Sequence, residues 1–344
     1  MAGATAIATG GAATLAACGS SGGGGGDKPS QLVVAGGGGA LTDAYRKAYY
    51  EPYTKKTGIK IVEATNDAAK LRSMVQFGDV EWDVAQLDPV IAASAANDHL
   101  LTPLDYAVIQ QQDLQKGLAT KYYLPCDIAA LVVAWNTKAI GSARAPSSWH
   151  DLLVRGRFSG RRGLWKQPSQ TLEVALLADG VKPDRLYPVD VDRALHVLDP
   201  IKSNIQWWTS GAQSAQQLIS RDVSLSAVWN GRVQPAKDQG EAVDFTFADS
   251  LLVADAWAVP KGTKNAKTAM EFIAFCMRAD NQANLAKHIP YGPVNTKAFD
   301  LMDDATKAKL PNAPGKHYAR VEDFDWWAAH QDEVMKRWND WLAT

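Results

Sequence analysis

The sequence has little excess charge of either sign and no long apolar run. Its 36 Lys and Arg residues balance 37 Asp and Glu residues, which leaves a net charge of −1. Nucleic acids and anionic membrane surfaces both attract clustered positive charge, so this balance indicates neither as a partner. No stretch reaches the roughly 18 apolar residues needed to span a bilayer. With 344 residues, of which 46% are hydrophobic, the chain is long enough for two lobes with separate cores.

The sequence also lacks motifs that carry common catalytic and metal chemistry. Its six His residues are scattered, and no H-E-x-x-H or C-x-x-C pattern is present. There are only three Cys residues. Two of them, Cys126 and Cys276, stand in apolar runs, so two buried free thiols are favoured over one disulfide. We therefore expect a protein that is not an enzyme and that holds no cofactor or metal ion.

The amino-terminal segment has the composition of a targeting signal. Residues 1–17 are mostly Ala, Gly and Thr, and small residues before a Cys are typical of a secretory cleavage site. Together with Cys18 they resemble the lipobox of bacterial lipoproteins, which implies a lipid on Cys18. Residues 18–30 include five consecutive Gly and predict a flexible tether. We expect a periplasmic protein, or a cell-surface lipoprotein, that contacts the membrane only through this lipid.

Strand and helix patterns alternate from Gln31 onward. Apolar strand patterns cover 32–35, 59–64 and 83–87, and helical patterns cover 40–56 and 67–77 between them. This order predicts a mostly parallel sheet flanked by helices, which is an α/β fold. Further on we expect strands at 128–135, 223–229, 243–247 and 251–259, a helix at 266–287, and a terminal helix that buries Trp326 and Trp327.

The composition changes after Trp135 and predicts a second lobe. We expect the first lobe to comprise residues 31–134 plus 255–344, and the second lobe residues 135–254. The chain would cross between them near Trp135 and Leu251. Two crossing strands form a hinge, and the cleft between two lobes is a natural place for a ligand. The sequence has no internal repeat, and we expect a monomer.

Several segments are similar to bacterial extracellular solute-binding proteins of ABC importers, in the spermidine/putrescine-binding branch. They are YYLPCD at 122–127, VVAWN at 132–136, AVWNG at 227–231, DAWAVPKG at 255–262 and YGPVN at 291–295. The resemblance covers most of the chain after Gln31. It implies a two-lobed periplasmic binding protein fold that closes on its ligand, with permease and ATPase subunits as partners. Relatives of this kind bind polyamines such as putrescine and spermidine, or ω-amino acids such as 4-aminobutyrate.

The resemblance also implies roles for three residues of this chain. Trp229 corresponds to an aromatic wall of the polyamine site, Asp255 to the carboxylate that takes an ammonium group, and Tyr291 to an aromatic residue near the hinge. Two departures weaken the case for a long polyamine. Val253 stands where polyamine binders often have Trp, and residues 166–169 (KQPS) do not supply the acidic residue expected from the second lobe.

Reasoning from residue types adds two more acidic candidates. Asp88 ends one predicted strand and Asp127 begins another, and strand ends at an open α/β sheet edge are where ligands bind. Each is also suited to a structural role, as a helix cap or as the ion-pair partner of a surface Lys, and the position of Asp88 just before Pro89 favours the cap. A carboxylate paired with an ammonium group away from water would contribute about 1.5–3 kcal/mol.

The remaining candidates suit a neutral or anionic group. Gly38 and Gly39 belong to a glycine loop that opens a helix, where backbone N–H groups attract anions, or they form only a turn. Arg232 either clamps a carboxylate or lies in solvent. Of the pair Trp207 and Trp208 we expect one to be core and one, Trp208, to line the site. Carboxylates for one end and donors for the other predict a zwitterion, so 4-aminobutyrate competes with putrescine as the ligand.

Two other ligands of the same fold stay open. Ferric-ion binders use Tyr pairs, and this chain has Tyr49-Tyr50 and Tyr122-Tyr123, although the first pair falls on a predicted helix and indicates packing. An aminophosphonate is the second alternative.

Overall fold

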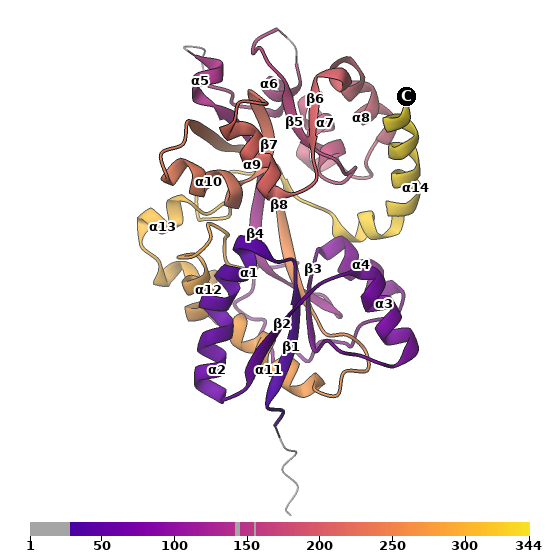
Figure 1. Ribbon diagram of the computed structural model, residues 1–344, viewed down its shortest axis with the longest axis vertical. Helices are drawn as coiled ribbons and strands as arrows, with labels where there is room; N and C mark the ends of the chain where they lie inside the picture. The colour runs from indigo at the N-terminus through magenta and orange to yellow at the C-terminus, as the bar shows by residue number, and fades with distance from the viewer. Residues whose placement is uncertain (1–27, 142–144, 155) are drawn as a thin grey trace, which may run out of the picture.

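The computed structural model describes residues 28–141, 145–154 and 156–344, which form two lobes along the long axis (Figure 1). The predicted signal (1–17), Cys18 and residues 19–27 of the tether lie outside the described residues. Within the described ranges, nine strands form one sheet in the order β2-β1-β3-β8-β4-β7-β5-β6, with β9 beside β8. Helices flank this sheet, so the molecule has the predicted α/β fold.

The first lobe begins with three parallel strands. These are β1 (Gln31–Gly36), β2 (Lys60–Thr65) and β3 (Val84–Leu87). The connecting helices are α1 (Gly39–Tyr45), a π-helical turn (Arg46–Tyr50), α2 (Glu51–Thr57), α3 (Ala68–Phe77) and α4 (Pro89–Asn97). Asp67 caps α3 as predicted, since its carboxylate accepts the Lys70 N–H at 2.6 Å. The predicted β-α-β-α-β order is confirmed.

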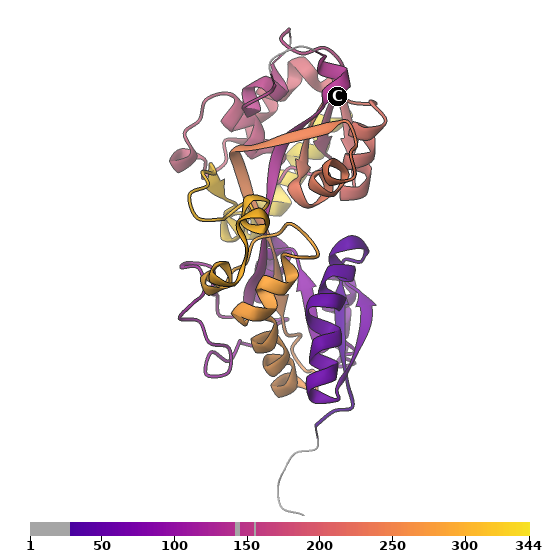
Figure 2. The same cartoon turned by 90° about the vertical axis from the view of Figure 1, so that its left-hand side faces the viewer.

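Two long antiparallel strands join the lobes, as Figure 2 shows from the side. They are β4 (Tyr123–Asn136) and β8 (Val243–Ala258). Every residue of β4 is buried, because strands or helices cover both of its faces. We predicted two strands for the β8 region, and this was wrong: a single strand continues through the polar interruption between Phe247 and Leu251. Strand β4 pairs with it on both sides of the interruption, with a register shift between Leu131 and Val133.

The second lobe extends the sheet on the other side of β4. Strand β7 (Leu225–Trp229) is antiparallel to β4, and β5 (Arg162–Trp165) and β6 (Ile205–Trp208) follow in parallel. Its helices are α5 (Thr137–Ile140), α6 (Trp149–Leu153), α7 (Thr171–Ala178), α8 (Val191–Leu198), α9 (Gly211–Ile219) and α10 (Asn230–Asp238), with 3-10 turns at Pro183–Arg185 and Asp199–Asn204.

After β8 the chain returns to the first lobe and then spans both lobes. The elements are α11 (Ala266–Cys276), α12 (Ala279–Leu285), a 3-10 turn (Thr296–Leu301), α13 (Asp304–Ala308), β9 (Arg320–Val321) and α14 (Phe324–Ala343). The single helix predicted at 266–287 is therefore two helices. The terminal helix is confirmed; Trp327 is fully buried in it, and Trp326 is partly buried. None of the helices in the described part is both long and apolar enough to cross a membrane.

The lobe boundaries stay a prediction, and α14 bears on them most directly. We assigned this helix to the first lobe. It packs against α4 of the first lobe and also touches α8 of the second. Trp207 of the second lobe meets the rings of Trp338 and Trp341 edge-on, at 5.4 and 6.2 Å between centroids. The last helix thus contacts both lobes.

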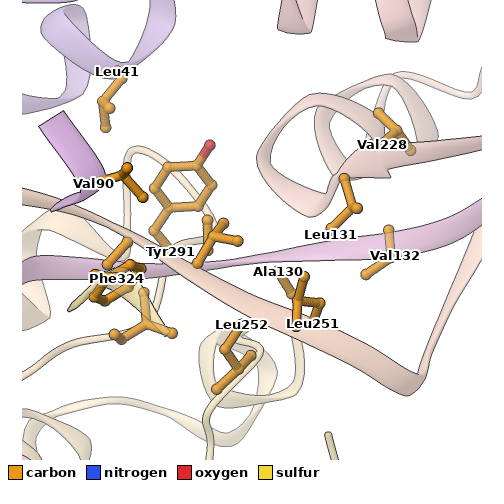
Figure 3. Packing of buried hydrophobic residues seen from close by; sticks show 14 of the residues in the cluster. Leu41, Val90, Ala130, Leu131, Val132, Val228, Leu251, Leu252, Tyr291 and Phe324 are labelled. Carbon is orange, nitrogen blue, oxygen red and sulfur yellow. The ribbon is translucent and has the colours of Figure 1, made fainter. Parts of the chain in front are cut away.

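One apolar core runs through the crossing strands into both lobes. Figure 3 shows Tyr291 beside these strands, among buried aliphatic side chains that include Leu41 and Val90. Cys126 and Cys276 are both free and buried. This continuous core fixes the positions of the strand ends from which the cleft described next is built.

Candidate ligand-binding cleft

A cleft of about 220 Å³ lies where the two lobes and the crossing strands meet. That volume is below the roughly 300–1,000 Å³ of pockets for drug-sized molecules, so the cleft suits a small ligand. It is lined by the first lobe (Gly37, Gly38, Leu41, Gln86, Asp88), the crossing strands (Ala129, Val253, Ala254, Asp255), the second lobe (Trp165, Gln170, Trp229, Arg232) and Tyr291. We call it the interlobe cleft.

Asp255 faces the cleft, and Asp127 lies behind it. The two residues are opposite each other on β8 and β4, and the Asp255 N–H donates to Asp127 Oδ1 at 3.3 Å. Asp127 is fully buried and also accepts a hydrogen bond from the Tyr45 hydroxyl. Of the two side chains, only that of Asp255 lines the cleft. Its Oδ1 accepts a hydrogen bond from Gln86 Nε2 at 2.7 Å. Asp255 is thus the carboxylate that a ligand can reach.

Asp88 both caps a helix and lines the cleft. Its Oδ1 accepts the Val90 N–H at 2.8 Å, which satisfies the first turn of α4. Both interpretations that we left open for Asp88 therefore describe the same side chain. The cap holds the carboxylate at the end of β3, close enough to Asp255 for their charges to interact.

Asp88, Asp127 and Asp255 form no ion pair with any of the described residues, although Arg232 lies close enough to influence Asp255. Burial and then the charge of Asp127 raise the pKa of Asp255 well above its ordinary value, and the Gln86 hydrogen bond and the charge of Arg232 only partly offset this. Burial also raises the pKa of Asp127 to about 7 and that of Asp88 above its usual range. A cation beside Asp255 would favour the ionised forms, so this end of the cleft is suited to a positively charged group.

The buried Asp127 gives the unliganded protein a defined pH dependence. A carboxyl group whose pKa rises on folding binds more protons in the folded state, so its contribution to stability falls as pH rises toward the folded pKa. For Asp127, whose folded pKa is about 7, we expect about 2–3 kcal/mol to be lost between pH 5 and pH 8. Urea unfolding of wild type and Asp127→Asn at both pH values measures this. The stability difference between the two proteins should move in favour of Asp127→Asn as pH rises, and a constant difference would contradict the assignment.

Arg232 brings positive charge to the same cleft. It lies in the first turn of α10, directly after β7, and its Nε atom is buried without a hydrogen-bond partner among the described residues. The first residue of α9, Gly211, packs closely on it: a Cβ added there would lie 2.7 Å from Nε. A buried guanidinium donor that is left unpaired is costly, and a carboxylate is its natural partner.

The aromatic wall consists of Trp165, Trp229 and Tyr291. Trp165 and Trp229 meet edge-on at 5.3 Å between centroids, and Trp229 Nε1 donates to Gln170 Oε1 at 3.0 Å. Trp208 does not line the cleft. It is fully buried behind both of these rings, and its Nε1 donates to the Ala227 carbonyl. Trp208 therefore supports the wall from the core.

The glycine loop contributes backbone to the cleft. Gly38 lines it and Gly39 does not, and both have a positive φ, 75° and 64°, which favours glycine there. The Gly37 N–H donates to Gln86 Oε1 at 3.3 Å, so the loop orients the amide that holds Asp255. The loop thus acts through Gln86 as well as at its own surface.

Among the lining residues with polar or aromatic side chains, sequence reasoning missed three, namely Gln86, Trp165 and Gln170. Gln86 and Trp165 stand at or near the ends of β3 and β5, which is the only sequence signal that could have found them. Gln170 has a positive φ of 65°, uncommon for a residue with a side chain and invisible in the sequence. Neither Tyr49-Tyr50 nor Tyr122-Tyr123 lines the cleft.

Comparisons with known proteins point to one family. The sequence profile of the family described as bacterial extracellular solute-binding protein matches residues 48–315. A gamma-aminobutyric acid-binding protein of Pseudomonas aeruginosa is 36% identical over 309 residues, which cover 87% of each chain. Spermidine/putrescine-binding periplasmic protein 1 of Haemophilus influenzae is 26% identical over 265 residues, 72% of each chain. A solved structure described as the Atu4243-GABA receptor is 37% identical with a TM-score of 0.85, and the match covers 91% of this chain and 98% of that one.

Proposed function

Because this chain belongs to the bacterial extracellular solute-binding proteins, we propose that its interlobe cleft captures an ω-amino acid, with 4-aminobutyrate as the leading candidate. One observation carries the proposal: Asp255 and Arg232 line the same small cleft. A ligand with an ammonium group at one end and a carboxylate at the other satisfies both. The relative named for gamma-aminobutyric acid supports this choice.

At the ammonium end, Asp255 accepts the charged N–H donors while Gln86 holds the carboxylate in place. Burial raises the pKa of Asp255, and an ammonium group that binds beside this carboxylate favours its ionised form. Trp165, Trp229 and Tyr291 surround the carbon chain. An ammonium group within about 6 Å of an aromatic face gains roughly 0.5–2 kcal/mol.

At the carboxylate end, Arg232 supplies the donors. Its planar guanidinium can hold a carboxylate through two parallel hydrogen bonds, which a diamine cannot offer. The second ammonium group of putrescine would instead meet a like charge. Putrescine remains the second candidate, because the acidic cluster of Asp88, Asp127 and Asp255 favours an amine whatever its other end.

Calorimetric titration of the full-length protein tests the ligand. We expect 4-aminobutyrate to bind at least about tenfold more tightly than putrescine or spermidine, a difference of about 1.4 kcal/mol or more. Tight binding of spermidine with no binding of any amino acid would reject the proposal. Tighter binding of 2-aminoethylphosphonate than of 4-aminobutyrate would show that Arg232 serves a phosphonate, which is the aminophosphonate alternative.

Family membership makes the protein the solute-binding component of an ABC importer, and its homologues work in the periplasm. We propose further that it acts as a monomer without catalysis, and that lobes 31–134 plus 255–344 and 135–254 close on the ligand for delivery to permease and ATPase subunits. Cys18 would carry the lipid anchor, with 18–30 as tether. Labelled palmitate that enters the wild type and not Cys18→Ala would support the anchor; equal labelling of both would reject it.

A further inference from the structure

A second cavity of about 240 Å³ adjoins the interlobe cleft. We call it the side chamber. The two cavities share Asp88 and Trp165, so these side chains stand at the junction between them. The other residues around the side chamber are Val90 and Ile91 of α4, Gln167, Pro168 and Ser169 after β5, and Trp327, Gln331 and Met335 of α14.

The side chamber has a different chemistry from the cleft. Its walls are mostly apolar, from Val90, Trp165, Trp327 and Met335, and Asp88 is the one charged residue among the described residues that line it. Arg232 lines the cleft and not the chamber. The chamber therefore suits an uncharged, largely apolar group that enters past Asp88, and it offers no second carboxylate for another ammonium group.

The junction determines which end of the ligand faces the side chamber. Asp88 lines the interlobe cleft together with Asp255 and adds a second carboxylate there, so it belongs to the ammonium end of the proposed site. A secondary ammonium group keeps its charge and two N–H donors, one for each of these carboxylates, while its substituent passes Trp165. A substituent on the carboxylate end would instead have to pass Arg232.

We propose that the protein also binds ω-amino acids whose nitrogen carries an alkyl substituent, with the substituent in the side chamber. This inference rests on the proposed function, because it takes the orientation of 4-aminobutyrate as given. Removal of the added CH₂ groups from water is favourable and offsets the cost of ordering the added chain.

Calorimetry with paired ligands tests the proposal. For the wild type we expect N-butyl-4-aminobutyrate to bind within about threefold of 4-aminobutyrate, or more tightly. Met335→Trp fills the chamber and should weaken the N-butyl ligand at least about tenfold, while 4-aminobutyrate changes less than about twofold. Met335→Leu, which nearly conserves the volume, is the matched control and should bind both ligands as the wild type does. Binding of 4-aminobutyrate reports that each variant is folded.

Two results would overturn the proposal. One is a loss of about tenfold or more for the N-butyl ligand in the wild type, and the other is an equal loss of both ligands in Met335→Trp. Putrescine and N-butylputrescine are titrated in parallel. If putrescine binds and 4-aminobutyrate does not, the proposed function fails, and the second pair still decides whether the chamber takes the substituent. If none of the four ligands binds, both proposals fail.

Discussion

Replacement of Asp255 by asparagine should weaken the binding of 4-aminobutyrate by at least about 100-fold. Removal of one partner of a buried, hydrogen-bonded charge pair costs about 2–5 kcal/mol, and each 1.4 kcal/mol is a factor of ten in affinity. Asparagine keeps the shape and the oxygen that accepts from Gln86, so the local hydrogen bond at 2.7 Å can persist. What disappears is the charge that faces the ammonium group. Titration calorimetry at pH 7 measures the change.

The matched control is Asp304→Asn, which removes the same charge from a fully exposed side chain that does not line the cleft. It should bind 4-aminobutyrate as the wild type does. Urea unfolding without ligand separates loss of binding from loss of fold: Asp255→Asn should be at least as stable as the wild type at pH 8, because the wild-type carboxyl is penalised by burial. A stable Asp255→Asn variant that binds within about fivefold of the wild type would contradict the role of Asp255.

The sequence was sufficient to predict the architecture where local pattern and tertiary pairing agree. The alternation of strands and helices over the first lobe is an example, because each apolar run there becomes one strand of a parallel sheet. Strand β8 is a counter-example. Its polar interruption around Asp249, which has a positive φ of 55°, favours a break. The strand continues because β4 supplies partners on both sides of the interruption, with a register shift between Leu131 and Val133. Only the partner strand reveals this.

The helix predicted at 266–287 shows a second limit. Its apolar periodicity is continuous, yet the helix ends at Cys276 and another begins at Ala279. The Asn295 side chain donates to the Met277 carbonyl at 2.9 Å, which satisfies a group freed by the break. The second helix then presents Gln282, whose amide bonds the backbone of both β4 and the segment after Tyr291. A tertiary network of this kind leaves no trace in periodicity.

The candidate site was also predictable only in part. Asp255, Trp229, Tyr291 and Arg232 carry residue types that are informative by themselves, and the structure brings them to one cleft. The Trp207-Trp208 pair was misleading, because neither ring lines the cleft. Trp208 is core and Trp207 packs on α14, while Trp165, the register partner of Trp208 on β5, provides the lining surface. Which aromatic side chain of a sheet faces a ligand depends on strand register and on the elements that pack against the sheet. Sequence spacing alone specifies neither.

The Arg232→Gln variant should exchange one ligand preference for another. We expect 4-aminobutyrate to bind at least about 30-fold more weakly, because its carboxylate loses a charged, bidentate partner worth about 2 kcal/mol or more. Putrescine should bind unchanged or more tightly, because the like charge opposite its second ammonium group is gone. Competition calorimetry measures the ratio of the affinities for 4-aminobutyrate and putrescine. A variant that only loosened the fold would weaken both ligands and would not reverse this ratio.

Arg232→Lys is the matched control for charge without the planar guanidinium. Lysine keeps the repulsion of a diamine but offers a single point charge, so we expect an intermediate loss of about tenfold for 4-aminobutyrate and no gain for putrescine. The Nε atom of Arg232 has no hydrogen-bond partner among the described residues, so the replacement breaks no hydrogen bond at this atom in the unliganded protein. A change in affinity then reports on the contact with the ligand. If Arg232→Gln weakens both ligands equally, or leaves 4-aminobutyrate unaffected, then Arg232 does not hold the carboxylate. The zwitterion would then be replaced by a simple amine as the ligand that fits the acidic cluster.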